Sequence, residues 1–176
     1  MAGYGNTPFG LNQITIIPAG GGSAVALEAA QEMQCEEETQ TAQLEGNDTV
    51  IAAKSTVRQV KWSIKGGGIS AEALAALTGR SVTVTGSGST EKTKVSTVGG
   101  VGYGYCKVQG KSLGDSGSDI HVILYKCQVT KVTPIAMKYG EYQTFACEGV
   151  AIADTGQSNL IMDVIQNKTA AALPTT

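Results

Sequence analysis

The stretch VKWSIKGGGISAEALAALTG, Val60 to Gly79, contains the two residue patterns that decide the fold. In its first half, Val60, Trp62 and Ile64 alternate with polar residues. Alternation with a period of two is typical of a β-strand that buries one face and exposes the other. Three consecutive glycines then interrupt the pattern, and glycine runs of this kind end strands. We therefore expect a strand with Trp62 as a core residue, followed by a turn.

The second half of the same stretch predicts a short helix over residues 70–78. Ser70 is a suitable N-cap because its hydroxyl can accept a hydrogen bond from a backbone N–H, and Glu72 lies in the first turn, where the helix dipole favours negative charge. Gly79 suits the left-handed conformation that ends many helices. One face of the helix is apolar and consists of Ile69, Ala73, Leu74 and Leu77. A helix this short is not stable alone, so we expect it to cover the flank or open end of a β structure.

Most of the remaining chain predicts β-strands. Its 176 residues fit one domain, and its 23 glycines favour turns, bulges and loops over long helices. Residues 159–167 fit either a strand or a short helix. The other strand patterns cover residues 12–18, 49–55, 57–65, 81–87, 91–98, 102–111, 119–132 and 141–154. Roughly eight strands with short connections and one helix predict a mainly β fold, an antiparallel β-sandwich or barrel flanked by one short α-helix.

The two ends of the chain are expected to extend from this single domain, 1–176. Residues 1–12 have the composition of an N-terminal arm, with Tyr4 and Phe9 as isolated aromatic residues. Aromatic anchors on terminal arms often dock on another surface. Residues 168–176 form a small, polar C-terminal tail.

Two interpretations remain open for residues 24–48. The ends of this segment alternate in the manner of strands, and its middle is acidic and polar, which favours two strands joined by an extended hairpin tip or loop. The alanine and glutamate content of residues 24–34 also suits a helix.

The residues give little basis for catalysis or metal binding. The only histidine, His121, lies in mid-strand, where a packed or partly exposed structural role is the more common one. The oxygens of Asp115, Ser116 and Asp119 suit calcium, but the EF-hand pattern is incomplete, and a turn stabilised by these side chains is the better interpretation. We predict no catalytic residue, no metal site and no cofactor. The cysteines form no C-x-x-C pair and are interpreted as free thiols: Cys35, Cys106, Cys127 and Cys147.

Charge and hydropathy exclude further classes of protein. The net charge is −2 and the isoelectric point about 5.4, without the basic patch of a nucleic-acid-binding protein. The start of the chain lacks a signal-peptide pattern, and no apolar run has the length of a membrane span, so we expect a soluble protein made in a cytoplasm. A β-rich chain with so few reactive groups is expected to contact other proteins.

Several stretches, taken in order, resemble the major tail tube proteins of long-tailed bacteriophages with non-contractile tails. Each stretch is structural and weakly specific by itself, but together they cover nearly the whole chain. They are YGNTPFGLNQITIIP (4–18), SAVALEAAQEMQCEEETQTAQLEGNDTVIAAKS (23–55), VKWSIKGGGISAEALAALTG (60–79), CKVQGKSLGDSGSDIHVILYKCQVT (106–130) and VIQNKTAAALPTT (164–176).

The resemblance implies a structural protein of the virion tail, assembled in the host cytoplasm. Six copies would form a ring whose sheets join into an inner β-barrel, and rings would stack into a tube that conducts the viral genome into the host cell. The expected partners are further copies of the chain, the tape measure protein, and the tail terminator and tip proteins. Viral DNA would pass through the lumen without specific binding, no membrane would be involved, and no enzyme activity is implied. The type VI secretion tube protein is a structural relative of this family.

The resemblance also implies where copies touch. A long loop at residues 36–48 and both chain termini would contact neighbouring subunits, and the helix would lie outside the barrel. The implied contact residues are Tyr4, Phe9, Glu36, Glu37, Glu38, Thr39, Glu45, Asn47, Asp48 and Leu173. The alternative function is a surface or secreted β-sandwich binding module for carbohydrate or adhesion. It would need an exposed aromatic platform, for which Tyr103, Tyr105 and Tyr125 are the candidates.

Overall fold

The computed structural model describes residues 8–46, 49–68, 70–114, 117–133 and 138–175. Its elements are β1 (Pro8–Pro18), β2 (Val25–Ala26), β3 (Ala30–Gly46), β4 (Thr49–Gly67), α1 (Ala71–Thr78), β5 (Val82–Thr85), β6 (Lys92–Val95), β7 (Tyr105–Gly114), β8 (Asp119–Val132), β9 (Thr144–Ile152) and β10 (Met162–Asn167). The strands pair antiparallel, and α1 is the one α-helix in the described ranges. The predicted fold class, mainly β with one short helix, is therefore confirmed.

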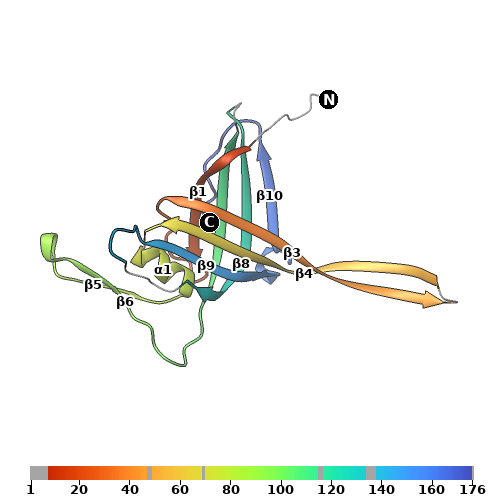
Figure 1. Cartoon of the computed structure of the whole chain (residues 1–176), viewed down its shortest axis with the longest axis horizontal. Coiled ribbons are helices and arrows are strands. Elements are labelled where there is room, and N and C mark those ends of the chain that lie inside the picture. The colour runs from red at the N-terminus through yellow and green to blue at the C-terminus, as the bar shows by residue number, and fades with distance from the viewer. Residues whose placement is uncertain (1–7, 47–48, 69, 115–116, 134–137, 176) are drawn as a thin grey trace.

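The main sheet folds over on itself at β8. Its strand order is β2-β1-β7-β8-β9-β4-β3, and β10 also pairs with β8. Along the edge of β8 that faces away from β7, β10 pairs with residues 119–124 and β9 pairs with residues 126–132. The single long strand thus belongs to two layers, β1–β7–β8–β10 and β8–β9–β4–β3. Figure 1 shows β1, β8 and β10 running upright and β3, β4 and β9 running across them.

The apolar core lies between these two layers. Alternate residues of β4, namely Val60, Trp62 and Ile64, are buried there, as the sequence pattern predicts. Residues from the other layer complete the same cluster: Ile14, Ile16, Cys106, Val108, Leu124 and Cys127. The core therefore joins the first and last strands of the sheet order into one body.

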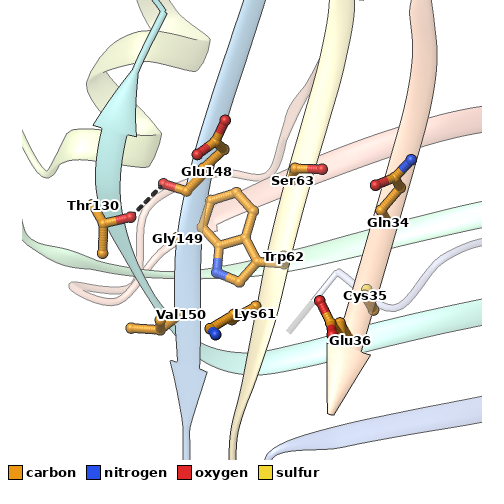
Figure 2. Close-up of a pocket in the computed structure, with 10 residues that line it drawn as sticks. All are labelled: Gln34, Cys35, Glu36, Lys61, Trp62, Ser63, Thr130, Glu148, Gly149 and Val150. Carbon is orange, nitrogen blue, oxygen red and sulfur yellow. Dashed lines mark hydrogen bonds between the residues drawn. The ribbon is translucent and has the colours of Figure 1, made fainter. Parts of the chain in front are cut away.

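One glycine is required where β4 and β9 meet. Trp62 pairs directly with Gly149, and the indole lies over the glycine in Figure 2. A Cβ atom added at Gly149 would lie 2.3 Å from the backbone oxygen of Gln128 and 2.5 Å from the Trp62 ring. Any side chain at this position would displace the largest aromatic residue of the core.

The predicted helix is present with its predicted caps. The Ser70 hydroxyl accepts a hydrogen bond from the Ala73 N–H at 3.2 Å, and Gly79 ends the helix in the left-handed conformation, at φ 69°. Ala73 and Leu77 are buried, Leu74 is partly buried, and Ile69 lies outside the described residues. The helix contacts β1, β2, β7 and β8, so it covers the core next to the upright layer, as expected for a helix too short to be stable alone.

Residues 24–48 contain strands and not the alternative helix. β3 runs to Gly46, so most of the loop expected at 36–48 is wrong: residues 36–46 are strand, and Asn47 and Asp48 lie outside the described residues. Pairing explains the difference, because β4 lies opposite along the whole length of β3, from Ala30↔Gly66 to Gly46↔Thr49. The polar composition reflects exposure of the strand to solvent and not a lack of structure.

The expected ends of the chain also differ from the structure. The strand β1 begins at Pro8, so residues 8–12 are part of the sheet and not of a free arm; residues 1–7 lie outside the described ranges. Residues 159–167, left open between strand and helix, contain β10. The C-terminal tail continues from β10 without regular secondary structure as far as it is described.

Two hairpins project from the body in Figure 1. The far half of β3–β4 extends to one side, and β5–β6 extends to the other. The strands of β5–β6 form a separate two-stranded sheet whose residues are mostly exposed. Both projections are two strands wide, the smallest possible sheet.

Candidate assembly interface

The far half of the β3–β4 hairpin, residues 36–46 and 49–59, is here called the arm. The neighbouring strand β9 pairs with β4 only from Val60 to Gly67, and β3 is the last strand in the sheet order. Both long edges of the arm therefore present backbone N–H and C=O groups that no neighbouring strand of the described chain pairs. Exposed strand edges are templates for pairing with another chain.

Both faces of the arm are exposed as well as its edges. Residues 36–45 and 49–58 are all solvent-exposed, including large apolar side chains: Leu44 is 62% exposed and Ile51 67%. Val50 and Val57 are also exposed. A two-stranded ribbon with no buried face is marginally stable in water. The arm therefore has the form of an element that gains its stability from a partner.

Acidic residues gather where the arm leaves the body. The Glu38 carboxylate accepts a hydrogen bond from the Gln59 side-chain amide at 2.6 Å and lies 3.4 Å from the Lys61 ammonium. These contacts, that with Gln59 first and then that with Lys61, hold the pKa of Glu38 below its usual value. Glu36 and Glu37 have no ion pair within the described residues, so their charges are free to face a partner.

An open hollow of about 650 Å³ lies at the root of the arm. Figure 2 shows the residues that line it, which come from β3, β4, β8 and β9: Gln34, Cys35, Glu36, Lys61, Trp62, Ser63, Thr130, Glu148, Gly149 and Val150. Its ionised groups are largely paired: Lys61 lies beside Glu38, and Glu148 lies 3.8 Å from Lys131.

The side chains that line this hollow have little chemical reactivity. Partial desolvation raises the pKa of the solvent-exposed Cys35 thiol to about 11, so the thiolate, the nucleophilic form, is scarce at neutral pH. The Trp62 indole N–H is buried without a hydrogen-bond partner in the described chain. The hollow could therefore contact a partner through its shape and its charged side chains, at the junction of the arm and the body.

The single histidine lies elsewhere, in a buried polar cluster. His121 Nε2 lies 3.0 Å from the Asp119 carboxylate, and both side chains are almost fully buried. Asp119 also accepts hydrogen bonds from Asn167 and from the Ala171 N–H, each at 2.7 Å, and pairs with the Lys111 ammonium at 3.1 Å. Because four donors surround it, the Asp119 carboxylate acts as a structural hydrogen-bond acceptor. Asp115 and Ser116 lie outside the described residues.

The predicted contact residues fall into three groups. Tyr4, Asn47 and Asp48 lie outside the described residues. Phe9, at 81% exposed on β1, and the residues of β3 are open to solvent: Glu36, Glu37, Glu38, Thr39 and Glu45. Leu173 is the exception, because it is only 9% exposed. The single chain buries Leu173 against itself, so its implied contact with a neighbouring subunit stays a prediction.

Some residues of the interface were missed from sequence. Residues 49–55 were expected to form a strand, and they do, but the sequence did not indicate that Val50 and Ile51 would lie on an exposed arm. The available signal was the presence of two long strand patterns next to each other in the chain, which can pair along their whole length.

Of the three tyrosines proposed as a ligand platform, Tyr105 and Tyr125 line one open hollow, and Tyr103 is not among its lining residues. Each ring is covered by a cation: Arg80 over Tyr103 and Lys107 over Tyr125, both at 5.2 Å from the ring centre, and Lys126 over Tyr105 at 4.9 Å. The Tyr125 hydroxyl also donates a hydrogen bond to Asp163 at 2.6 Å.

Neither known protein-family models nor curated proteins give a match to this chain. No helix of the described residues has both the length and the apolar character needed to cross a membrane. In the same residues, no cluster of three or more His, Cys, Asp and Glu side chains is arranged to hold a metal ion.

Proposed function

We propose that this protein is a structural subunit of a bacteriophage tail tube. Copies of the chain associate into hexameric rings, the rings stack around a channel, and the viral genome passes through that channel into the host cell. The order of sequence stretches that resemble tail tube proteins supports this proposal, and so does the geometry of the arm.

The observation that carries the proposal is the exposure of the arm. Its edges are open, both of its faces are wet, and it presents exposed Leu44 and Ile51. Pairing with a second copy would bury these side chains and satisfy the edge groups together. In this proposal the arm of one copy meets a different surface of the next, and such heterologous contacts close into rings or continue as filaments.

The charge of the chain is compatible with transit of nucleic acid. A net charge of −2 and the unpaired Glu36 and Glu37 favour a surface that does not retain a polyanion. In this proposal the DNA, the tape measure protein, and the terminator and tip proteins are transient or end-of-tube partners, and the main partner is the chain itself.

Electron microscopy of the purified full-length protein tests the proposal. Negative-stain images over a range of concentrations, together with sedimentation velocity, are expected to show sixfold rings or hollow tubes. A protein that stays monomeric at every concentration and temperature, even with tail-tip complexes added as initiators, would contradict it.

A further inference from the structure

The upright layer buries polar side chains on the face that points away from the core. Gln109 pairs with Thr15 on one side and Ile123 on the other, and Lys111 pairs with His121 in the next row. Their chain neighbours, such as Val108 and Leu124, point into the core, so this row lies on the opposite face. Yet Gln109 is 0% exposed and His121 3%. Another segment must therefore cover this face.

The cover is the C-terminal segment, residues 168–175, here called the strap. The Ala170 N–H donates to the Gly117 carbonyl at 2.8 Å, and the Ala171 N–H donates to Asp119 at 2.7 Å. The Lys111 ammonium donates to the Ala171 carbonyl. At its far end, Thr175 lines a hollow together with Lys107 and Tyr125. The strap thus runs along β8, from the Asp119 end toward Tyr125.

Recognition of the strap depends on two features. One is the Asp119 carboxylate, which is fully buried and accepts from the strap backbone while Lys111, His121 and Asn167 hold it in place. The other is Leu173, the buried apolar side chain of the strap. A backbone N–H on a carboxylate and one buried side chain are contacts by which a folded surface can also recognise an extended peptide.

The floor of this face is incompletely satisfied by the strap. Both polar atoms of the Gln109 side-chain amide are buried and have no hydrogen-bond partner in the described residues. Buried polar groups normally find hydrogen-bond partners, so the unpartnered amide is the exception on this face. An amide side chain can both donate to and accept from a peptide backbone.

We propose that the outer face of the β1–β7–β8–β10 layer is a binding groove for an extended peptide, and that the chain's own C-terminal segment occupies it as a releasable strap. The ligand is a short peptide with a leucine two residues after the N–H that meets Asp119. This proposal holds whether or not the chain assembles into tubes.

The test uses the full-length chain and its Leu173→Ala variant, with Leu160→Ala as the matched control because Leu160 is an exposed leucine. Hydrogen exchange by NMR is expected to show the Ala170 and Ala171 amides protected at least tenfold in the unmodified chain and in the control. Leu173→Ala should abolish that protection while the amides of β7 and β8 stay protected.

A fluorescent peptide, KTAAALPTT, then probes the emptied groove. We expect it to bind the Leu173→Ala chain at least tenfold more tightly than the unmodified chain, whose groove is occupied. A peptide with alanine in place of the leucine should lose at least tenfold in affinity. The Asp119→Asn chain should release its strap but fail to bind the added peptide.

Three results would overturn the proposal. The first is free exchange of Ala170 and Ala171 in the unmodified chain, which would mean that the strap is not seated. The second is release of the strap in Leu173→Ala without uptake of the peptide. The third is unfolding of the β7–β8 sheet when Leu173 is truncated, which would make the segment part of the core.

Discussion

At the scale of single residues, stability depends on a few positions where chemistry and space are tightly constrained. Gly149 leaves room for the Trp62 ring, and Asp119 collects four hydrogen-bond donors in a site closed to water. Neither role is visible in the sequence. A glycine in a strand and an aspartate after a glycine loop have many ordinary explanations, and only the pairing register selects one.

Replacing Gly149 with alanine is expected to destabilise the protein by about 1–3 kcal/mol, the usual cost of overpacking a core. The added methyl group would collide with the Gln128 carbonyl and the Trp62 ring. Urea unfolding followed by Trp62 fluorescence measures the loss. Gly102→Ala is the control, because a Cβ there meets no atom within 4 Å. Equal midpoints for the two variants would show that the contact of Trp62 and Gly149 is not tight.

Asp119 predicts a defined dependence of stability on pH. Burial by itself would raise the pKa of Asp119, but the hydrogen bonds from Ala171, Asn167, Lys111 and His121 outweigh it and hold the pKa well below its usual range. Since the folded pKa is lower than the unfolded value near 3.9, the ionised carboxylate contributes its full stability above about pH 4. That contribution is lost as the pH falls toward the folded pKa.

Asp119→Asn is therefore expected to cost about 3–5 kcal/mol at pH 7, the range for removing one partner of a buried pair. The difference between their free energies of unfolding should narrow by about 1 kcal/mol at pH 3, because only the unmodified chain takes up a proton at position 119 on unfolding. Urea titrations at both pH values measure this. A gap of constant size would mean that folding does not shift the pKa of Asp119, and a gap that widens at pH 3 would mean that its folded pKa is raised.

The cysteines predict a simple pattern of reactivity. Burial raises the pKa of Cys106 and Cys147 to about 12 and that of Cys127 well above its usual value, and all three are almost fully buried. Cys35 is exposed, although its pKa is also raised, to about 11. A disulfide reagent at pH 8 should therefore modify one thiol slowly in the native protein and four in denaturant. Cys35→Ser should leave none reactive in the native state, and rapid reaction of a second thiol would contradict this burial.

At the scale of elements, the sequence predicted what depends on local periodicity and missed what depends on distant partners. The helix at residues 71–78 was predicted together with its caps, because Ser70 and Gly79 act within one turn of it. The length of β3 was missed, since an acidic strand that is wet on both faces has no period-two pattern. The strap was expected as a free tail, because nothing near Leu173 indicates the buried Asp119 more than fifty residues earlier in the chain.

The arm is expected to be the least protected part of the isolated chain. With open edges and no buried face, its backbone hydrogen bonds open without unfolding the body. Hydrogen exchange measured by mass spectrometry should show residues 39–46 and 49–57 exchanging at least tenfold faster than residues 60–66. The last segment belongs to β4 and pairs with β9. If the chain assembles as proposed, the arm should become protected in the assembled fraction. Slow exchange along the arm in a proven monomer would contradict the expectation that the arm opens without unfolding of the body.

At the scale of the whole molecule, two projections on opposite sides of one body give it distinct ends. Figure 1 shows the arm and the β5–β6 hairpin pointing away from each other. An antiparallel twofold dimer would place the arm of each copy beside the β5–β6 hairpin of the other, whereas head-to-tail association would repeat a single contact in one direction. The proposed tube requires the second arrangement.

Ile51→Ser tests whether the arm drives this association. Ile51 is 67% exposed, so the change should leave the free energy of unfolding within about 0.5 kcal/mol of the original. It should nevertheless raise the concentration needed for rings or tubes at least tenfold, since about 1.5–3 kcal/mol of apolar burial per contact is lost. Sedimentation velocity measures the monomeric and the assembled fractions at each protein concentration. Val101→Ser, with the valine 69% exposed in a loop, is the control, and equal effects of the two changes would rule out a specific role of the arm.

The shared strand β8 has a mechanical consequence for any structure that this subunit builds. The strand β8 is hydrogen-bonded to β10 along its first half and to β9 along its second. The two layers therefore share a strand and cannot slide past each other without breaking its hydrogen bonds. Tension applied through either layer is carried by the same strand into the other. Under load, a subunit built in this way would bend at the arm and at the β5–β6 hairpin, while the two layers that share β8 stay rigid.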